Sequence, residues 1–410
     1  MSGPEVLRPD RAFVEQILRS GGADLKKCYQ CATCSVVCSL APQERPFPRK
    51  EMLWAQWGLK DRLLADPDVW LCHQCHDCSA RCPRCGRPAD VLAALRRQCV
   101  EHYAVPRFLA RMTSPVQRLL LMLLIPAVLL AAALLVRAPL RSSALGGVLH
   151  FFDHEGFYAR LFPHWLLIGF FSFFWGLALL GAVVGLVRFW RAMKAGDAAA
   201  GRYRPVLGIW PSFVRTLGSI FRHDKFGQCT SHAWRRPAHL GALYGCAALF
   251  LVSVWAVIAL YVLNPLIPGT ANDLAYPFGL LNPWKLLANL GALALVGGCL
   301  YAIARRGRGL TEAGASTSFD WVFVGLLLGV GVTGLLTEIL RLVTAPAAHS
   351  AAEGLAALGY VAYAVYFVHL VLVFDLLVYL PHSKFAHALY RPVALVYAEH
   401  SGRNGARGTA

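Results

Sequence analysis

Two cysteine runs in the first quarter of the chain constrain its fold more than any other feature. One is Cys28-Tyr-Gln-Cys31-Ala-Thr-Cys34-Ser-Val-Val-Cys38, and the other is Cys72-His-Gln-Cys75-His-Asp-Cys78-Ser-Ala-Arg-Cys82-Pro83. Both have the spacing C-x2-C-x2-C-x3-C, which holds a pair of [4Fe–4S] clusters, and the fourth cysteine of each run serves the other cluster. We therefore expect one cluster on Cys28, Cys31, Cys34 and Cys82, and a second on Cys72, Cys75, Cys78 and Cys38.

Three other interpretations of these runs fit less well. Structural zinc uses two C-x2-C pairs and would leave cysteines of each run unmatched. A disulfide framework is typical of secreted chains, and the first residues lack the apolar segment of a signal peptide. Cys72-His-Gln-Cys75-His76 also matches the c-type haem attachment pattern, but that interpretation leaves Cys78 and Cys82 unused. Cys85 is close enough to be a substitute ligand, although eight thiolates already complete the two clusters.

Short helices are expected around the cysteine runs. Residues 10–20, 50–64 and 90–103 have apolar residues at helical spacing, and Pro106 begins a linker. The sequence thus predicts a helical ferredoxin-like domain over residues 1–105. We expect a membrane domain over residues 106–395 and a cytoplasmic tail over residues 396–410.

The rest of the chain is too apolar for a soluble protein, since 57% of the 410 residues are hydrophobic. Six stretches approach the roughly 20 residues that a transmembrane helix needs. They are residues 116–136, 164–187, 238–262, 285–304, 320–343 and 355–380. The predicted fold is therefore all-α: a helical two-cluster domain followed by a six-helix bundle in the membrane.

Basic residues predict the orientation of this bundle. The loops on the side of the cysteine runs, 188–236, 305–319 and 381–410, carry 10, 3 and 4 Lys and Arg, whereas the opposite loops carry 3, 0 and 0. Lys and Arg concentrate in cytoplasmic loops, so the clusters and the C-terminus are expected in the cytoplasm, at the inner membrane. This explains the net charge of +17 without a nucleic-acid partner, and it places the c-type haem pattern on the wrong side.

Clusters beside a membrane domain need a further electron carrier, and haem b held by axial histidines is the usual one. His369 and His387 are 18 residues apart, which is five turns, or roughly 27 Å, if one helix runs through both. Each would then bind its own haem. His239 matches the depth of His387 at the inner end, and His164 is the expected partner of His369, with His154 as its competitor.

Three further features lie in the predicted spans. Glu338 and Arg341 are three residues apart near the outer end of the fifth span, and ionisable groups in a span are costly, so they are either an ion pair or part of a quinone site. Asp375 in the sixth span raises the same alternatives. Gly329-Val-Gly331-Val-Thr-Gly334 matches the dinucleotide fingerprint, but it lies inside a span with no strand before it, so helix packing is the favoured role. We find no flavin motif, and any flavin is expected on a partner.

Several segments resemble one known family. They are Cys28-Tyr-Gln-Cys31, the stretch Phe47-Pro-Arg-Lys-Glu-Met-Leu-Trp-Ala-Gln-Trp-Gly-Leu-Lys-Asp61, Cys78-Ser-Ala-Arg-Cys82-Pro-Arg84, Gly331-Val-Thr-Gly-Leu-Leu-Thr-Glu338 and Tyr379-Leu-Pro-His-Ser-Lys-Phe-Ala-His387. Together they are similar to the family of membrane C subunits of the quinone-interacting membrane-bound oxidoreductase (Qmo) complex. That family fuses a heterodisulfide-reductase-C-like ferredoxin domain to a cytochrome b domain like the nitrate reductase gamma subunit.

The resemblance implies electron exchange between a quinone and adenylylsulfate reductase, in sulfur metabolism, through flavin-containing iron–sulfur subunits. The family's histidine spacing in its last helix matches His369 and His387. The gamma subunit has two histidines in one early helix, whereas the third span here has only His239. We expect an electron-transfer subunit with two [4Fe–4S] clusters and two haems b. The alternatives are a heterodisulfide-reductase-like or sulfite-reductase-linked subunit, and a membrane anchor without haem.

Overall fold

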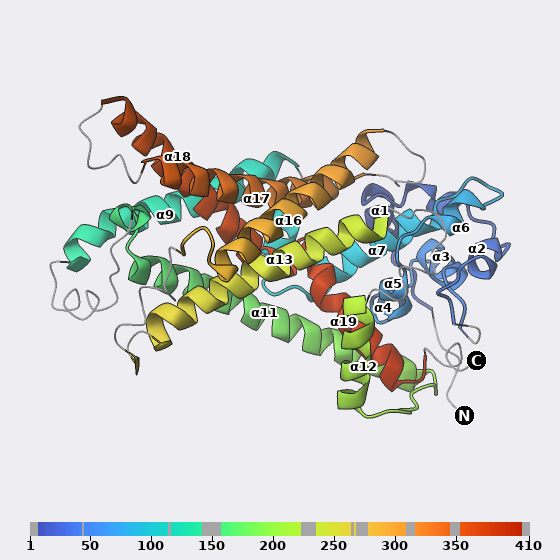
Figure 1. Cartoon of the computed structure of the whole chain (residues 1–410). Helices are drawn as coiled ribbons and strands as arrows, with labels where there is room; N and C mark the ends of the chain where they lie inside the picture. Colours follow the sequence, from blue (N-terminus) through green and yellow to red (C-terminus); the bar gives the residue numbers. More distant parts are fainter. Residues whose placement is uncertain are drawn as a thin grey trace.

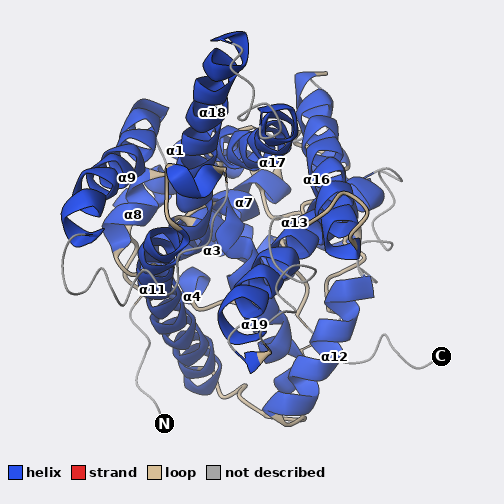
Figure 2. Ribbon diagram, turned by 60° about the vertical axis from the view of Figure 1, so that its left-hand side comes forward, coloured by secondary structure: helices blue, strands red, loops and turns tan. Residues whose placement is uncertain are grey.

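The computed structural model is helical, and the part of the chain that it describes contains no strand (Figure 2). It describes residues 7–42, 45–113, 116–141, 157–222, 235–263, 266–267, 278–308, 316–344 and 353–403. The expected all-α class is therefore confirmed. His154 and most of the outer loops lie outside the described residues.

Short helices connected by tight turns build the first quarter of the chain. Asp10 caps the first of them by accepting a hydrogen bond from the Phe13 backbone N–H at 2.9 Å. The helices before the first span are α1 (Arg11–Arg19), η1 (Ala23–Lys27), α2 (Thr33–Val36), α3 (Arg49–Gln56), α4 (Lys60–Leu64), α5 (Asp68–Leu71), α6 (Asp77–Ala80), α7 (Pro88–Tyr103) and α8 (Arg107–Met112). The buried side chains of Phe13, Ile17, Leu63, Trp70 and Leu95 form the centre of their core.

Five helices in the rest of the chain are long and apolar enough to cross a membrane. They are α11 (His164–Ala199), α13 (Arg235–Ile258) with its π-helical end η5 (Ala259–Leu263), α16 (Pro283–Gly307), α17 (Ser318–Thr344) and α18 (Glu353–Val378). The first expected span corresponds to α9 (Leu119–Arg141), whose described apolar part, Leu119–Leu135, is shorter. Their lengths and composition make the chain a membrane protein.

Helix α11 extends well beyond the expected end of its span and links the two parts of the molecule (Figure 1). It has 36 residues, and its last three turns leave the apolar bundle. There Phe189 and Met193 are buried in the same core as Trp70 and Tyr103. Shared apolar burial of this kind favours one arrangement of the two parts.

The two histidines His369 and His387 do not share one helix, which was the condition for their five-turn relation. Helix α18 ends at Val378, two short 3-10 turns follow (η8, Leu380–His382, and η9, Lys384–Ala386), and α19 begins at His387. Pro381 has no backbone N–H, and Ser383 is extended with its hydroxyl accepting from the Phe385 N–H at 3.2 Å. The five-turn relation between the two histidines therefore does not hold.

Helix α19 (His387–His400) is part of the core of the iron–sulfur domain. The Tyr390 ring stacks on Trp70 with centroids 5.4 Å apart, and the Tyr397 hydroxyl donates to Asp197 of α11 at 2.9 Å. The boundary expected at residues 395/396 falls inside this helix. Only residues 404–410 of the expected tail lie outside the described chain.

One further helix, α12 (Ile209–Arg222), lies between α11 and α13 in sequence and packs on α19. Its polar residues Ser212 and Thr216 are buried, whereas Trp210, Phe213 and Phe221 are exposed. Tyr244 of α13 donates to the Phe221 carbonyl at 2.7 Å, so the end of α12 lies beside the N-terminal half of α13.

Candidate metal centres

Residues 28–34, the first cysteine loop, and residues 72–78, the second, follow the same backbone path. Gln30 and Gln74 have positive φ angles of 68° and 53°, and Ala32 and His76 have 69° and 70°. These residues stand at equivalent places of the two runs, just before the short helices α2 and α6. A left-handed conformation is costly for residues other than glycine. The left-handed conformation recurs at two equivalent pairs of positions, which indicates that both loops curve around a bound group in the same way.

The thiols gather in two groups that mix the runs. Burial, together with the charges of the nearby thiols of Cys28, Cys31 and Cys82, raises the pKa of Cys34 to about 11. These four thiols are the first thiol set. The thiol of Cys38 lies instead beside Cys72 and Cys75, and burial raises its pKa to about 12. The charges of Cys72, Cys75, Cys38 and Cys34 act on Cys78, and Cys72, Cys75, Cys78 and Cys38 line one cavity, so these four form the second thiol set.

A small cavity lies inside the second set. All four of its cysteines line this cavity, together with His73, His76 and Phe47. The two sets lie close together, because Cys34 and Cys78 share one buried apolar cluster with Ala89. Thiols raised in pKa by burial bind iron as thiolates once the metal offsets their charge. Four converging sulfur atoms are the donor set that a [4Fe–4S] cluster needs, so both sets fit such a group.

Hydrogen bonds to sulfur occur in both loops. The Gln74 backbone N–H donates to Cys72 Sγ at 3.3 Å, and Gln30 Nε2 donates to Cys28 Sγ at 3.4 Å. Donors of this kind stabilise thiolate charge and tune a cluster's potential. Cys85 lies outside both sets: it is exposed and has a φ of 51°, and its N–H donates to the Cys82 carbonyl at 3.0 Å.

A cavity of about 370 Å³ lies between the iron–sulfur domain and the membrane helices. We call it the histidine cavity, because His239 of α13 and His387 of α19 both line it. Its walls also carry six arginine side chains, Arg96, Arg97, Arg235, Arg305, Arg306 and Arg391. The expected pair of inner histidines thus faces one space, although the two residues come from helices far apart in sequence.

His387 is prepared to bind a metal ion through one nitrogen. Its Nδ1 lies 2.7 Å from the Lys384 carbonyl, and because a carbonyl only accepts, Nδ1 must carry the proton. The lone pair is then on Nε2, the usual arrangement for an imidazole ligand. Burial lowers the pKa of His387 to about 4, so the ring is neutral at pH 7.

His369 has a comparable arrangement deeper in the bundle. The Thr333 hydroxyl donates to the Gly329 carbonyl at 2.6 Å and lies 2.9 Å from His369 Nδ1. Because the hydroxyl proton of Thr333 is donated to Gly329, the hydroxyl oxygen must accept the hydrogen bond from His369 Nδ1. The lone pair of His369 is then on Nε2, where it can bind a metal ion. Gly334 adds room here, since a Cβ on it would lie 3.2 Å from His369 Cε1. These features fit an axial ligand.

His164 lies at the level of His369 on a neighbouring helix. The Phe162 and Phe367 ring centroids are 6.3 Å apart, and those of Phe170 and Phe374 are 5.5 Å apart. His164, the first residue of α11, lies between Phe162 and Phe170 in the chain, as His369 lies between Phe367 and Phe374. The described contacts of the His369 ring, however, are with α17, and the structure brings no direct His164–His369 contact into view among its described residues.

The expected quinone residues have different surroundings from those anticipated. Glu338 pairs with Lys285 of α16 at 2.8 Å and accepts from Asn289 Nδ2 at 3.3 Å. Lys285 is buried at the start of its span. The ion pair expected between Glu338 and Arg341 is thus replaced by one between two helices. Asp375 of α18 is fully buried, and its oxygens have no hydrogen-bond partner among the described residues.

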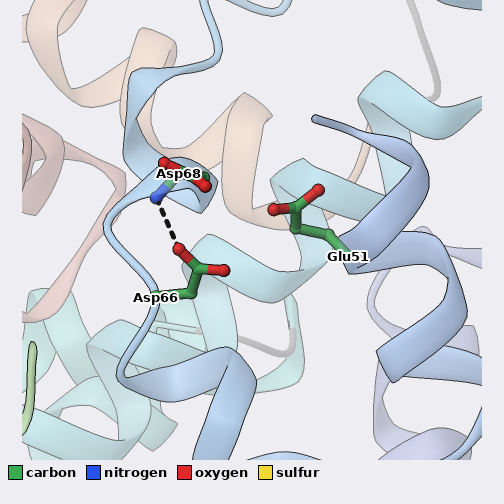
Figure 3. Close-up of side chains that lie close together, drawn as sticks. All are labelled: Glu51, Asp66 and Asp68. Atoms are coloured by element: carbon green, nitrogen blue, oxygen red, sulfur yellow. Dashed lines mark hydrogen bonds between the residues drawn. The ribbon is translucent and has the colours of Figure 1, made fainter. Parts of the chain in front are cut away.

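An ionic cluster that sequence reasoning missed supports the second loop. The carboxylates of Glu51, Asp66 and Asp68 converge, and the Asp68 N–H donates to Asp66 Oδ1 at 3.0 Å (Figure 3). Lys50 Nζ lies 3.1, 2.7 and 2.6 Å from the three, in the place that a metal ion would take. Arg403 adds pairs to Asp66 and Asp68. Two side chains therefore supply the positive charge.

The role of Arg235 was also missed by the sequence analysis. Arg235 precedes His239 by one helical turn, and the sequence analysis included it only in the count of basic residues in the expected inner loops. Its Nη1 donates to the Gln74 carbonyl at 2.7 Å, and its Nη2 donates to the His73 carbonyl at 2.8 Å. A basic residue one turn before a candidate ligand was the available signal, but it did not reveal the partner.

Comparisons with known proteins agree with the iron–sulfur interpretation of the first quarter. Residues 24–85 match the family described as the 4Fe-4S dicluster domain. The C subunit of the H(2):CoB-CoM heterodisulfide,ferredoxin reductase of Methanothermobacter marburgensis is 37% identical over 95 residues, which are 22% of this chain and 50% of that relative. A protein of Archaeoglobus profundus, described as similar to the C subunit of heterodisulfide reductase, is 38% identical over 94 residues, with coverages of 22% and 50%.

The likeness to these relatives covers about a fifth of the chain in each case. The C subunit of the ferredoxin:CoB-CoM heterodisulfide reductase of Methanosarcina mazei is 33% identical over 87 residues, covering 21% of this chain and 52% of the relative. The chain spans about half the length of the curated relatives it matches. No solved structure matches it. The chain thus joins a two-cluster iron–sulfur domain that resembles the C subunits of heterodisulfide reductases, and that is suited to electron transfer, to a set of membrane helices.

Proposed function

We propose that this chain is a membrane electron-transfer subunit that passes electrons between a quinone in the bilayer and cytoplasmic flavin-containing iron–sulfur partners. The observation that carries the proposal is the histidine cavity. On one side it is bounded by the second cysteine loop, through His73, Gln74 and His76, and on the other by His239 and His387. The proposed iron–sulfur site of the second thiol set therefore adjoins the proposed haem site of His239 and His387, where the iron–sulfur domain meets the membrane helices.

Each group has residues of this chain that suit it. The first and second thiol sets would each hold a [4Fe–4S] cluster. His239 and His387 would hold the inner haem b, and His369 with His164 the outer one. Haem iron held by two imidazoles supplies one-electron exchange without binding a substrate. The arginines of the histidine cavity would offset the two carboxylates of a haem there.

The partners follow from what the chain lacks. The sequence contains no flavin motif, while the first cysteine loop is open to solvent at Cys31 and Tyr29. A soluble flavoprotein would reach the clusters there. The link to adenylylsulfate reductase, and the quinone near Glu338 and Arg341, rest on the family resemblance and on the ionisable groups of α17. Basic inner loops favour a cytoplasmic iron–sulfur domain.

A heterodisulfide-reductase-like role is the second candidate. The relatives that match the first quarter are named as C subunits of such reductases. In that case the electrons from the membrane would serve a disulfide-reducing partner. Copurification under mild detergent separates the two candidates, because the flavin-bearing partner would be an adenylylsulfate reductase module in one case and a disulfide-reducing module in the other.

The decisive experiment is a reduced-minus-oxidised visible spectrum of the purified chain, with its haem and iron content. We expect haem b together with iron in excess of the haem. His387→Ala should remove the haem of the histidine cavity and leave the outer haem spectrally intact, whereas His369→Ala should do the reverse. His102→Ala, outside the cavity, is the matched control. A wild-type protein with iron but no haem would leave the membrane part as an anchor.

A further inference from the structure

The second cysteine loop forms a wall shared by two cavities. His73 and His76 line the cavity inside the second thiol set and also line the histidine cavity. Among the described residues that line these two cavities there is no member of the first thiol set. The second set is therefore the one that adjoins the membrane site.

Arginines from both parts of the molecule hold this wall. Arg96 of α7 donates from Nη1 to the Cys72 carbonyl at 2.8 Å, and Arg235 of α13 donates to the next two carbonyls, those of His73 and Gln74. Three consecutive carbonyls of the loop are thus bound by charged donors. Hydrogen bonds from a charged donor are among the stronger ones in proteins.

The position of Arg235 couples the loop to a candidate ligand. Arg235 and His239 are four residues apart on α13, which is about one turn and about 6 Å of rise. The loop needs external support at this point, because Gln74 and His76 are both left-handed. Arg235 thus fixes the loop and His239 in one rigid unit.

We propose that Arg235 is a positioning residue that holds the second thiol set against the histidine cavity and makes that set, rather than the first, the port for electron exchange with the membrane. This rests on the proposed function. In each exchange one electron leaves the group held by the second set as one arrives at the group held by His239 and His387, or the reverse. No proton and no further reactant is required.

The test compares Arg235→Gln with Arg236→Gln in the full-length protein. Both variants remove one positive charge from the first turn of α13, but Arg236 donates from Nη2 to the Arg222 carbonyl at 3.0 Å, away from the loop. Hydrogen exchange of residues 72–76 measures the hold on the loop. The rate at which the ferrous haem absorbance is lost, after dithionite-reduced protein is mixed with ferricyanide, measures electron exchange.

We expect Arg235→Gln to retain iron and haem while loop exchange rises, and haem reoxidation slows, by about tenfold or more, as the loss of a charged hydrogen-bond donor implies. Arg236→Gln should match the wild type in both measurements. Arg235→Lys keeps the charge and should restore part of both effects. If Arg235→Gln loses its cofactors, the same two measurements on Arg235→Lys take its place as the test of the proposal.

Two results would overturn the inference. One is equal loop exchange in the Arg235 and Arg236 variants; the other is a loosened loop with unchanged haem reoxidation. Failure of the proposed function looks different, because the wild type would then contain iron but no haem. The hydrogen-exchange comparison would still report whether Arg235 holds the loop.

Discussion

The two cysteine loops have the same spacing and the same left-handed residues but opposite surroundings. In the first loop Cys34 is 8% exposed, but Cys31 is exposed and Tyr29 has an exposed fraction of 57%. In the second, Cys72 and Cys78 are each 8% exposed. The repeated pattern determines how each loop winds around its thiols, and the residues outside the pattern determine what each loop faces.

The supports of the loops differ in the same way. The first loop is held mainly by Gln56, whose Nε2 donates to the carbonyls of Leu25 and Cys28 at 3.1 and 2.8 Å. The second follows α5, where Trp70 is stacked on Tyr390 and Asp68 joins the ionic cluster. We infer that the first loop is suited to meeting a soluble partner and the second to a fixed place beside the membrane.

The largest expected effect concerns the crossed thiol sets. Cys82→Ser should remove about half of the iron, and the lost cluster should be that of Cys28, Cys31 and Cys34 rather than the one nearest in sequence. Iron analysis with EPR of the variant measures this. Selective loss of the cluster of Cys72, Cys75 and Cys78 would contradict the crossed assignment and make each loop self-sufficient.

A smaller effect is expected from the support of the second loop. Arg403→Gln removes one of the two cations that pair with Asp66 and Asp68, as well as a partner of Asp197, while Lys50 stays in place. Breaking a buried pair costs up to about 3–5 kcal/mol. The urea midpoint for loss of cluster absorbance should fall accordingly. Arg11→Gln is the control, since Arg11 is exposed and pairs only with Glu15 in the described chain. Equal midpoints in the two variants would mean that the ionic cluster does not support the loop.

Accessibility should set the order in which iron is lost. During slow oxidation by ferricyanide with a chelator, the first set should lose iron before the second, because Cys31 is exposed and Cys78 is buried. A hydrogen bond involving Thr33 also lowers the pKa of Cys31, which favours its reactive thiolate. Mass spectrometry of alkylated peptides should find Cys28 and Cys31 modified before Cys72 and Cys78. The reverse order would refute the proposed difference in exposure.

The smallest effect concerns pH. Burial raises the pKa of Glu51 to about 8, although Lys50 opposes this shift. Because the folded pKa lies above the unfolded value of about 4.5, this group favours the folded state most below pH 4.5, and that contribution is lost as the pH rises towards 8. Glu51→Gln should therefore flatten the dependence of the thermal midpoint on pH between 5 and 8. An unchanged slope would show that Glu51 is ionised when folded.

Local patterns in the sequence predicted much of this molecule. Apolar length located the membrane helices, and the cysteine spacing predicted two clusters, because both depend on residues close together in the chain. The level of His239 with His387 was also anticipated from the predicted spans. The histidine cavity is consistent with that expectation.

Other features depend on contacts between distant residues. Arg403 reaches Asp66 across 337 positions, and Lys285 pairs with Glu338 from another helix; no local pattern predicts either contact. The break before His387 was signalled by Pro381 and by the predicted end of the sixth span at residue 380, and the five-turn relation applied only if one helix ran through both histidines. Where the sequence suggested a tail from residue 396 onwards, Tyr397 is buried in the core of the iron–sulfur domain, a contact that only the folded chain reveals.

The packing of α19 has a consequence for the order in which the protein is made. The cysteine loops are translated before the described membrane helices, yet their core contains Tyr390 and Tyr397, and Arg403 pairs with Asp68 in the ionic cluster. These three residues are translated after those helices. The iron–sulfur domain therefore reaches the packing seen here only after the described membrane helices have been made.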